Sequence, residues 1–286
     1  MKRLILSCMF FLIFVLSGTT DATILTDHFG ITLSVDGGGN FNNLWAPTLN
    51  TSTANYVVAD WATSGPPIPS GGEAFDVEAM YFDNDATYAY FAIVTSMPAT
   101  GYPGSMFGWP THYFNPGDIA IDINSGYPPA SDFVYEYGIK TIGGSAGRIE
   151  SGATWVYDQG SAGYPNGYPP QGATQYTKFN VGSGTHEGDA TIFEYVNAGL
   201  TEKGWATWVI GAKVFLSDLG NPGNGTTLVT RFSPDCNNDL LFSPATLSGG
   251  NFDINMVVPV PEPSTLLLLG FGLMGAGIFG RRALKK

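Results

Sequence analysis

Four aspartates have the residue type and spacing to bind a hard cation. Asp83 and Asp85 lie at the turn between two strand-like segments, and Asp118 and Asp122 lie on a third such segment. Ca²⁺ prefers carboxylate oxygens, so these four acids are candidate Ca²⁺ ligands. They do not form an EF-hand, because Tyr88 stands where the sixth loop position needs glycine. The alternative is an Asx-type turn whose acids are solvated.

The tripeptide Gly-Tyr-Pro occurs four times, each time within loop-like composition. Proline restricts the chain after each tyrosine, so a ring presented there loses little entropy when it binds a ligand. Such rings suit a sugar or an apolar patch on a partner. The alternative is that these tyrosines fold back over the rim of the domain. The candidate ligand-binding residues are Tyr102, Trp109, Tyr127, Tyr164 and Tyr168.

One segment matches a hydrolase nucleophile motif. Gly143–Gly147 fits G-x-S-x-G, which requires a strand followed directly by a helix. The residues after it are strand-like and include Gly152, so the motif predicts a hairpin loop. His28, His112 and His186 have neither the context of a catalytic base nor the spacing of a zinc site. We therefore expect no catalytic residues and no enzyme activity.

The composition indicates a folded, acidic protein. The 286 residues include 38 Gly, 19 Pro and 14% aromatic residues, and the formal net charge is −12. The apolar content suffices for a core, which excludes a disordered acidic tail. The negative charge argues against a nucleic-acid partner, which needs a basic face.

Short segments with period-two alternation, separated by turn residues, predict strands. Helical apolar spacing is not sustained before the C-terminal apolar run, and only residues 216–219 are expected to form a helical turn. The sequence therefore predicts an all-β fold, a single antiparallel β-sandwich (jelly-roll-like) over residues 23–259. The expected strands are 75–82, 88–95, 118–123, 133–140, 153–157, 205–215, 227–232 and 239–242.

The N-terminus has the parts of a secretory signal peptide. Met1–Arg3 is basic, an apolar run extends from Leu4 to Leu16, and small residues precede a cleavage site after Ala22. We expect residues 1–22 to be removed during export. The alternative is an N-terminal membrane anchor, but the apolar run is shorter than the ~20 residues that a transmembrane helix needs.

The C-terminus has a different three-part pattern. Val260–Pro263 contains a Pro-Glu-Pro triplet, residues 264–280 are mostly apolar, and residues 281–286 are basic. This order predicts a short transmembrane helix at 264–280 whose C-terminal end stays inside the cell.

These three parts resemble the PEP-CTERM sorting signal of exported proteins in Gram-negative bacteria. The resemblance covers residues 260–286 and implies Sec export, an inner-membrane-anchored precursor and processing by an exosortase. It implies that the mature protein is at the cell surface or outside the cell. The residues that it assigns to sorting are Val260, Pro261, Glu262, Pro263, Arg281 and Arg282.

The central segment is similar to DOMON and family-9 carbohydrate-binding modules. The resemblance rests on the predicted hairpin, on Gly117–Asp122 and on Phe232–Asp239, which has Asn237 where that group has glycine. It implies a β-sandwich that binds a carbohydrate.

The charge of the exported part limits its partners. Residues 23–259 carry 22 acidic and six basic residues, a formal charge of −16. Such a surface repels anionic polymers unless a divalent cation bridges them. We expect a non-enzymatic cell-surface or matrix protein whose sandwich binds an extracellular polysaccharide or a surface protein. The alternatives are a secreted polysaccharide-acting hydrolase on a jelly-roll scaffold and a ligand-free structural envelope protein.

Overall fold

The computed structural model describes residues 24–34, 45–58, 73–107, 113–123, 135–156, 177–202, 204–235 and 241–247. The chain divides into two compact units, residues 1–250 and residues 251–286, and all of the described residues belong to the first. The predicted signal peptide, sorting motif and transmembrane helix lie outside the described residues. Within those residues, no helix is long and apolar enough to cross a membrane.

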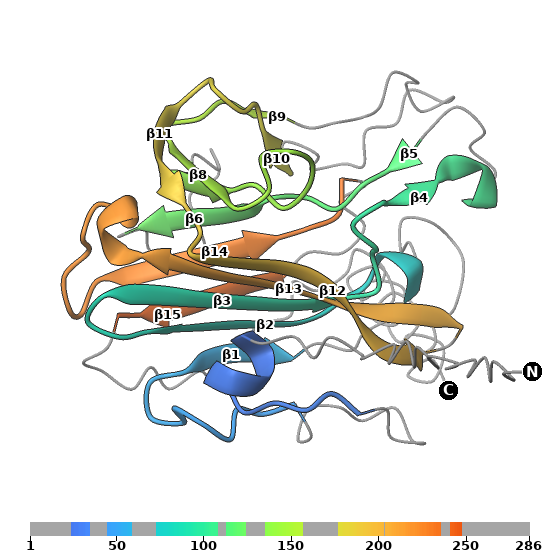
Figure 1. Ribbon diagram of the computed structural model, residues 1–286, viewed down its shortest axis with the longest axis horizontal. Coiled ribbons are helices and arrows are strands. Elements are labelled where there is room, and N and C mark those ends of the chain that lie inside the picture. Colours follow the sequence, from blue (N-terminus) through green and yellow to red (C-terminus); the bar gives the residue numbers. More distant parts are fainter. Residues whose placement is uncertain are drawn as a thin grey trace, which may run out of the picture. The chain divides into compact units, whose positions relative to one another are not determined.

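Most of the described strand residues lie in two antiparallel β-sheets (Figure 1). The five-stranded sheet has the order β1-β2-β3-β13-β12. Its strands are β1 (Asn55–Val58), β2 (Val77–Asn84), β3 (Tyr88–Thr95), β12 (Ile192–Glu202) and β13 (Trp205–Phe215). The six-stranded sheet has the order β11-β8-β7-β6-β14-β15. Its strands are β6 (Ile119–Ile123), β7 (Tyr137–Ile139), β8 (Arg148–Ser151), β11 (Thr185–Asp189), β14 (Thr227–Phe232) and β15 (Leu241–Thr246).

The remaining elements are short. Two further strand pairs are β4 (Tyr102–Pro103) with β5 (Tyr113–Phe114), and β9 (Trp155–Val156) with β10 (Lys178–Phe179). The helical turns are η1 (Ile24–His28), η3 (Glu73–Phe75), η4 (Gly104–Phe107) and η5 (Leu216–Leu219). The all-β prediction is confirmed, and so is the helical turn at 216–219.

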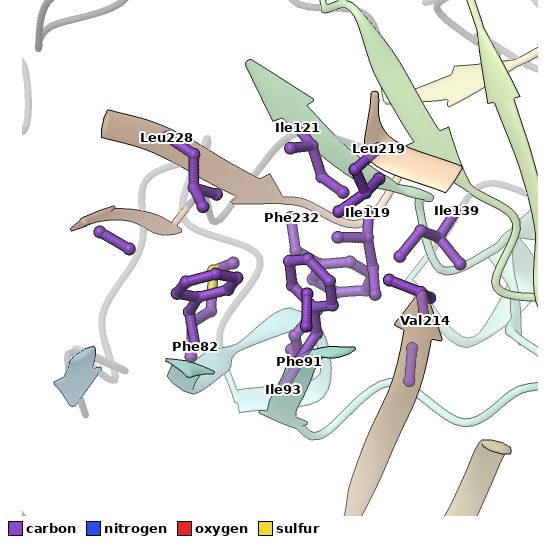
Figure 2. Close-up of a cluster of buried hydrophobic side chains, with 14 of the residues drawn as sticks. Phe82, Phe91, Ile93, Ile119, Ile121, Ile139, Val214, Leu219, Leu228 and Phe232 are labelled. Atoms are coloured by element: carbon purple, nitrogen blue, oxygen red, sulfur yellow. The ribbon is translucent and has the colours of Figure 1, made fainter. Parts of the chain in front are cut away.

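The main hydrophobic core lies between the two large sheets, as in a sandwich. Phe82, Phe91 and Ile93 of the five-stranded sheet pack against Ile121 and Phe232 of the six-stranded sheet (Figure 2). Side chains along a strand alternate between its two faces. The neighbours of these core residues therefore point to the outer faces of the sandwich, and these faces carry the polar groups of interest.

Each outer face has its own cover. On the five-stranded sheet, Leu25, Phe29 and Trp45 of the N-terminal segment pack over Tyr81 and Val94. On the six-stranded sheet, Trp155 of β9 and Phe179 of β10 pack with Ala120 and Tyr135. Both outer faces are thus partly buried, which explains how a domain with few charged residues encloses several of them.

Candidate functional sites on the two outer faces

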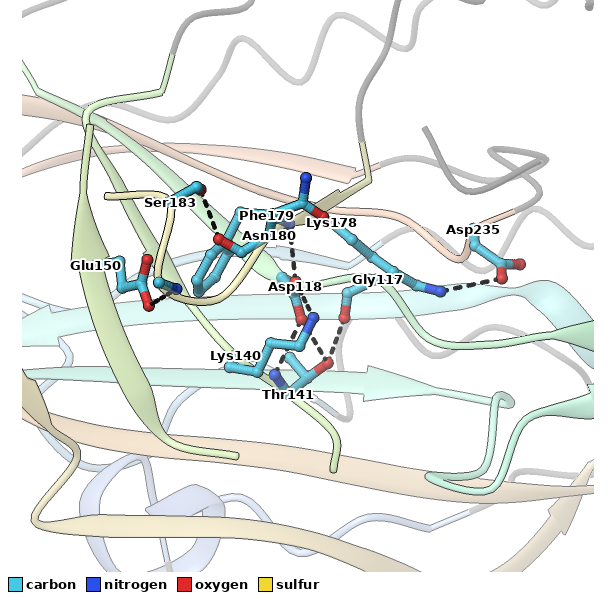
Figure 3. A network of polar contacts seen from close by, with 11 residues as sticks. Gly117, Asp118, Lys140, Thr141, Glu150, Lys178, Phe179, Asn180, Ser183 and Asp235 are labelled. Carbon is cyan, nitrogen blue, oxygen red and sulfur yellow. Dashed lines mark hydrogen bonds and ion pairs between the residues drawn. The ribbon is translucent and has the colours of Figure 1, made fainter. Parts of the chain in front are cut away.

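Asp118 is the centre of a buried polar network on the outer face of the six-stranded sheet (Figure 3). It directly precedes β6, and its carboxylate accepts hydrogen bonds from Lys140 Nζ at 2.9 Å, Thr141 N at 3.1 Å and Phe179 N at 3.1 Å. Burial raises the pKa of Asp118, and the ion pair with Lys140 and these hydrogen bonds oppose that rise. The carboxylate therefore ties β10 and the end of β7 to β6.

Lys178 and Asp235 form a second buried ion pair nearby. Lys178 Nζ lies 3.3 Å from Asp235 Oδ2, which also accepts a hydrogen bond from the Asn115 amide at 3.3 Å. Both charged residues are almost fully buried. Burial raises the pKa of Asp235 to about 6, although Lys178 favours the ionised carboxylate. The pair joins β10 to the segment that follows β14.

Glu150 of β8 stabilises the turn before β11. Its buried carboxylate accepts hydrogen bonds from Gly182 N at 2.6 Å and Gly184 N at 3.2 Å, and it forms an ion pair with Arg148 Nε at 2.6 Å. Burial acts to raise the pKa of Glu150, but the hydrogen bonds and Arg148 outweigh it and lower the pKa. These contacts indicate that the Glu150 carboxylate has a structural role in the turn.

Asp122 and Glu136 form a carboxylate pair farther along the same face. They share a side-chain hydrogen bond, and Glu136 Oε2 also accepts a hydrogen bond from Ile123 N at 2.9 Å. Burial, together with the hydrogen bond and the charge of Asp122, raises the pKa of Glu136 to about 7. Near this pair, buried Arg231 donates to the Tyr135 hydroxyl at 2.8 Å.

The opposite outer face, on the five-stranded sheet, holds His28 and Asp83. His28 Nε2 lies 2.8 Å from Asp83 Oδ2, and its ring stacks on Tyr90 at 3.6 Å. The Asn50 side chain donates to the His28 carbonyl oxygen at 2.8 Å. These contacts hold the end of η1 on the sheet.

Asp85 occupies the turn between β2 and β3. Its Oδ1 accepts hydrogen bonds from Thr87 N at 2.7 Å and Tyr88 N at 2.8 Å, and its Oδ2 accepts one from the Tyr90 hydroxyl at 2.7 Å. These hydrogen bonds outweigh the effect of desolvation and lower the pKa of Asp85. The Asx-type turn that the sequence offered as an alternative is the arrangement found here.

An uncovered aromatic strip continues from this turn across the outer face. We define the strip as Tyr88 of β3 with Lys213 and Phe215 of β13, next to Ile192 of the edge strand β12. The rings of Tyr88 and Phe215 lie 4.8 Å apart, and Lys213 Nζ lies 4.0 Å over the Tyr88 ring. Phe215 is 37% exposed and Ile192 is 42% exposed. Large apolar side chains thus face solvent beside a cation.

Among the described residues, the four candidate Ca²⁺ ligands are not brought together in one place. Ile119 and Ile121 point into the core, so Asp118 and Asp122 point to the outer face of the six-stranded sheet. Phe82 points into the core from the other sheet, so Asp83 points to the opposite outer face. Within the described ranges, no group of three His, Cys, Asp or Glu side chains is placed to hold a metal ion.

Of the candidate ligand-binding aromatics, only Tyr102 lies in the described part of the chain. Its hydroxyl donates to the Ser96 carbonyl oxygen at 3.0 Å, and its ring packs on Phe75 and Trp205 at 6.3 and 5.1 Å. Tyr102 therefore folds back over the domain, which is the alternative that the sequence analysis gave to a ligand-binding role. Trp109, Tyr127, Tyr164 and Tyr168 lie outside the described residues.

The G-x-S-x-G segment is the turn between β7 and β8. Gly147 N donates to the Lys140 carbonyl oxygen at 2.7 Å, and Ala146 N donates to the Gly143 carbonyl oxygen at 3.1 Å. A hairpin turn of this kind lacks the following helix of a nucleophile elbow. The prediction of a hairpin loop is confirmed.

Sequence reasoning missed most of the polar groups that the fold encloses. Lys178 and Asp235 were not predicted as a pair, nor were Lys140 and Glu150 assigned a role. The sequence did contain one signal for Lys178. Charged residues make up only 13% of the chain, and this lysine directly precedes the aromatic residue Phe179. The sorting residues Val260, Pro261, Glu262, Pro263, Arg281 and Arg282 lie outside the described residues.

Comparison with known families identifies the C-terminal segment. Residues 259–283 match the model of the PEP-CTERM protein-sorting motif. Neither the search of curated proteins nor the search of solved structures gave a significant match. The resemblance of the sandwich to DOMON-like modules thus stays a prediction. The chain carries a PEP-CTERM sorting motif, which marks it as an exported protein that an exosortase processes from a membrane-anchored precursor.

Proposed function

We propose that the processed chain is a non-enzymatic surface or matrix protein whose β-sandwich binds a neutral extracellular glycan at the aromatic strip. The contact between partly buried Tyr88 and exposed Phe215, beside Lys213, is the observation that carries this proposal. Aromatic rings pack well against the apolar C–H faces of sugar rings. The ammonium group of Lys213 supplies hydrogen-bond donors for sugar hydroxyls.

The charge balance supports a neutral ligand. Three of the described basic residues, Lys140, Arg148 and Lys178, form ion pairs, and Arg231 is buried against Tyr135. Lys213, in contrast, lies over the rings of Tyr88 and Tyr90 next to Asp85, whose pKa its charge lowers, within a segment of formal charge −16. A polyanion would gain one attraction there and meet repulsion from the rest of the surface.

Affinity electrophoresis of the secreted, processed protein tests this proposal. Neutral and anionic polysaccharides are included in separate gels, with and without Ca²⁺. A neutral polysaccharide should retard the wild type, and Phe215→Ala should remove most of that retardation. Tyr113→Ala is the matched control, because Tyr113 is 47% exposed on β5. Equal retardation of Phe215→Ala and the wild type, or no retardation by any polysaccharide, would contradict a ligand site at the strip.

The Asp122–Glu136 pair gives the hydrolase alternative its specific observation. A carboxyl group whose pKa is raised to about 7 is suited to donate a proton at neutral pH. Glycosidases, however, separate their two carboxyl groups by ~5–9.5 Å, whereas these two hydrogen-bond to each other. A screen for reducing ends released from the same polysaccharides distinguishes the two functions. Release that Glu136→Gln abolishes would favour the hydrolase.

A further inference from the structure

The connection between η5 and β14 contains an asparagine that is placed to react with its own backbone. Asn224 and Gly225 are exposed and form the centre of a turn, in which Thr226 N donates to the Gly223 carbonyl oxygen at 3.0 Å. Gly225 has a positive φ of 82°, and an added Cβ there would meet no atom within 4 Å. The backbone nitrogen next to the Asn224 side chain is therefore uncrowded, because glycine carries no side chain and the space around it is open.

The following residue distinguishes Asn224 from two other asparagines. Asn221 is followed by Pro222, whose ring leaves no N–H on the backbone nitrogen. Asn180 is followed by Val181, whose branched Cβ crowds the backbone nitrogen. All three asparagines are exposed, so accessibility alone does not separate them. Of the three, only Asn224 precedes a nitrogen that both carries an N–H and is unhindered.

Hydrogen bonds restrain the side chains of two further asparagines. Asn50 Nδ2 donates to the His28 carbonyl oxygen at 2.8 Å, and Asn197 Oδ1 accepts a hydrogen bond from Gly199 N at 2.7 Å. Each of these amides has to give up its hydrogen bond before it can react. Within the described part of the chain, the Asn224 side chain has no hydrogen-bond partner, so its amide can turn toward the next backbone nitrogen.

We propose that Asn224 is a site of spontaneous deamidation, which converts its amide into a carboxylate in the processed protein. The Gly225 nitrogen gives its proton to solvent and attacks Asn224 Cγ. The new N–C bond closes a succinimide ring, while the bond from Cγ to the amide nitrogen breaks. That nitrogen takes a proton from water and leaves as ammonia. A second water molecule then opens the ring at either carbonyl carbon, which yields aspartate or isoaspartate, so water is the only co-reactant.

Isoaspartate at this position would disturb the end of the β14–β15 pair. Gly225 N donates to the Leu247 carbonyl oxygen at 3.3 Å, and Leu247 N donates to the Thr226 carbonyl oxygen at 3.0 Å. The first of these hydrogen bonds is long, so it is readily broken when the nitrogen attacks. Leu247 is 1% exposed and belongs to the main core. The main chain of isoaspartate runs through the side-chain carbons, and the extra carbon moves Gly225 away from Leu247. The modification therefore loosens this end of the sandwich and adds a negative charge to it.

Peptide mapping by mass spectrometry, on the secreted and processed protein incubated at neutral and alkaline pH, tests the proposal. Among the described asparagines, the mass change from amide to carboxyl should appear first at Asn224, at least about tenfold faster than at Asn180. The rate should rise with pH, because the attack requires loss of the Gly225 amide proton. The map also resolves the second Asn-Gly pair of the sequence, Asn166 and Gly167, which lies outside the described residues.

One variant tests the effect of the following residue, and another isolates the effect of the charge. Val181→Gly gives Asn180 the same neighbour as Asn224 and should bring its rate close to that of Asn224; Val181 is 42% exposed, so the change removes no core side chain. Asn224→Asp carries the new charge without the extra main-chain carbon. The isoaspartate form, isolated by ion exchange, should melt about 2–4 °C below Asn224→Asp, which corresponds to one hydrogen bond of average strength in a domain of this size.

The unfolded protein in urea provides the reference, because every asparagine is then accessible. Equal rates at Asn224 and Asn180 in the folded protein would overturn the proposal. So would an unmodified Asn224 in the folded protein after the same residue has been converted in urea at the same pH. Equal melting temperatures of the isoaspartate form and Asn224→Asp would contradict the loosening of the β14–β15 end.

Discussion

Replacement of Gly138 by alanine should displace the β9–β10 pair from the six-stranded sheet. Gly138 lies on β7 between Ala120 of β6 and Glu150 of β8. A Cβ at this position would lie 2.6 Å from Phe179 Cδ1 and 2.8 Å from Trp155 Cζ2. Neither ring can move inward, because the sheet lies beneath them, so the covering pair has to lift.

The size of the effect follows from what this displacement disturbs. Overpacking of a buried site costs ~1–3 kcal/mol. Lifting β10 also lengthens the hydrogen bond from Phe179 N to the charged Asp118, a class of interaction that contributes ~1.5–3 kcal/mol. We expect a total near 3 kcal/mol, because relaxation trades one term against the other. For a domain of this size that corresponds to a fall of about 6–12 °C in the melting temperature.

Thermal and urea unfolding, followed by tryptophan fluorescence, measures this change. Gly144→Ala is the matched control: it adds the same methyl group in the β7–β8 turn, where no atom lies within 4 Å of the new Cβ. The Gly138→Ala protein should also show a red-shifted emission before unfolding, as Trp155 gains contact with water. A melting temperature within 1 °C of the Gly144→Ala protein would refute the packing role assigned to Gly138.

Two other predictions concern aspartate side chains. Since the pKa of Asp235 is raised from 3.8 to about 6, the folded state holds this proton more tightly than the unfolded state, and stability should fall as the pH rises from about 4 to 6. The change in the pKa of Asp235 corresponds to roughly 3 kcal/mol of unfolding free energy. Urea titrations between about pH 4 and 6 should show that Asp235→Asn removes this pH dependence of stability. An unchanged pH dependence would contradict the raised pKa of Asp235. Because Asp83, Asp85 and Asp118 do not converge and Asp85 is engaged in its turn, Asp85→Asn should leave any response of the melting temperature to Ca²⁺ or EDTA unchanged. A Ca²⁺-induced rise that Asp85→Asn abolishes would restore the calcium site.

The sequence predicted the central strands well and the edge strands poorly. The segments 88–95, 205–215 and 227–232 coincide with β3, β13 and β14, because these largely buried strands are rich in β-branched and aromatic residues. In contrast, β11 and β12 were not predicted. They are edge strands, and β11 is mostly exposed along its whole length, so its residues Thr185–Asp189 carry no apolar pattern.

The candidate sites depended on long-range geometry that local spacing does not contain. Asp83 belongs to β2 of the five-stranded sheet, and Asp118 directly precedes β6 of the six-stranded sheet. Each side chain points away from the core between the sheets, so these two acids lie on opposite outer faces although they are only 35 residues apart. The Asx-type turn at Asp85, by contrast, is a local structure, and the local sequence allowed it to be stated as the alternative to a Ca²⁺ site. The strip of Tyr88, Lys213 and Phe215 joins residues more than 120 positions apart and had no local signal.

Mass spectrometry of the secreted protein tests the central claim, which is that the sorting motif directs processing. The secreted form should begin near Thr23 and end between Pro261 and Ser264. Substitution of Pro261, Glu262 and Pro263 by alanine should leave a membrane-retained precursor that still ends at Lys286. Recovery of extracellular protein with an intact Lys286, or normal release of the alanine variant, would contradict sorting by this motif.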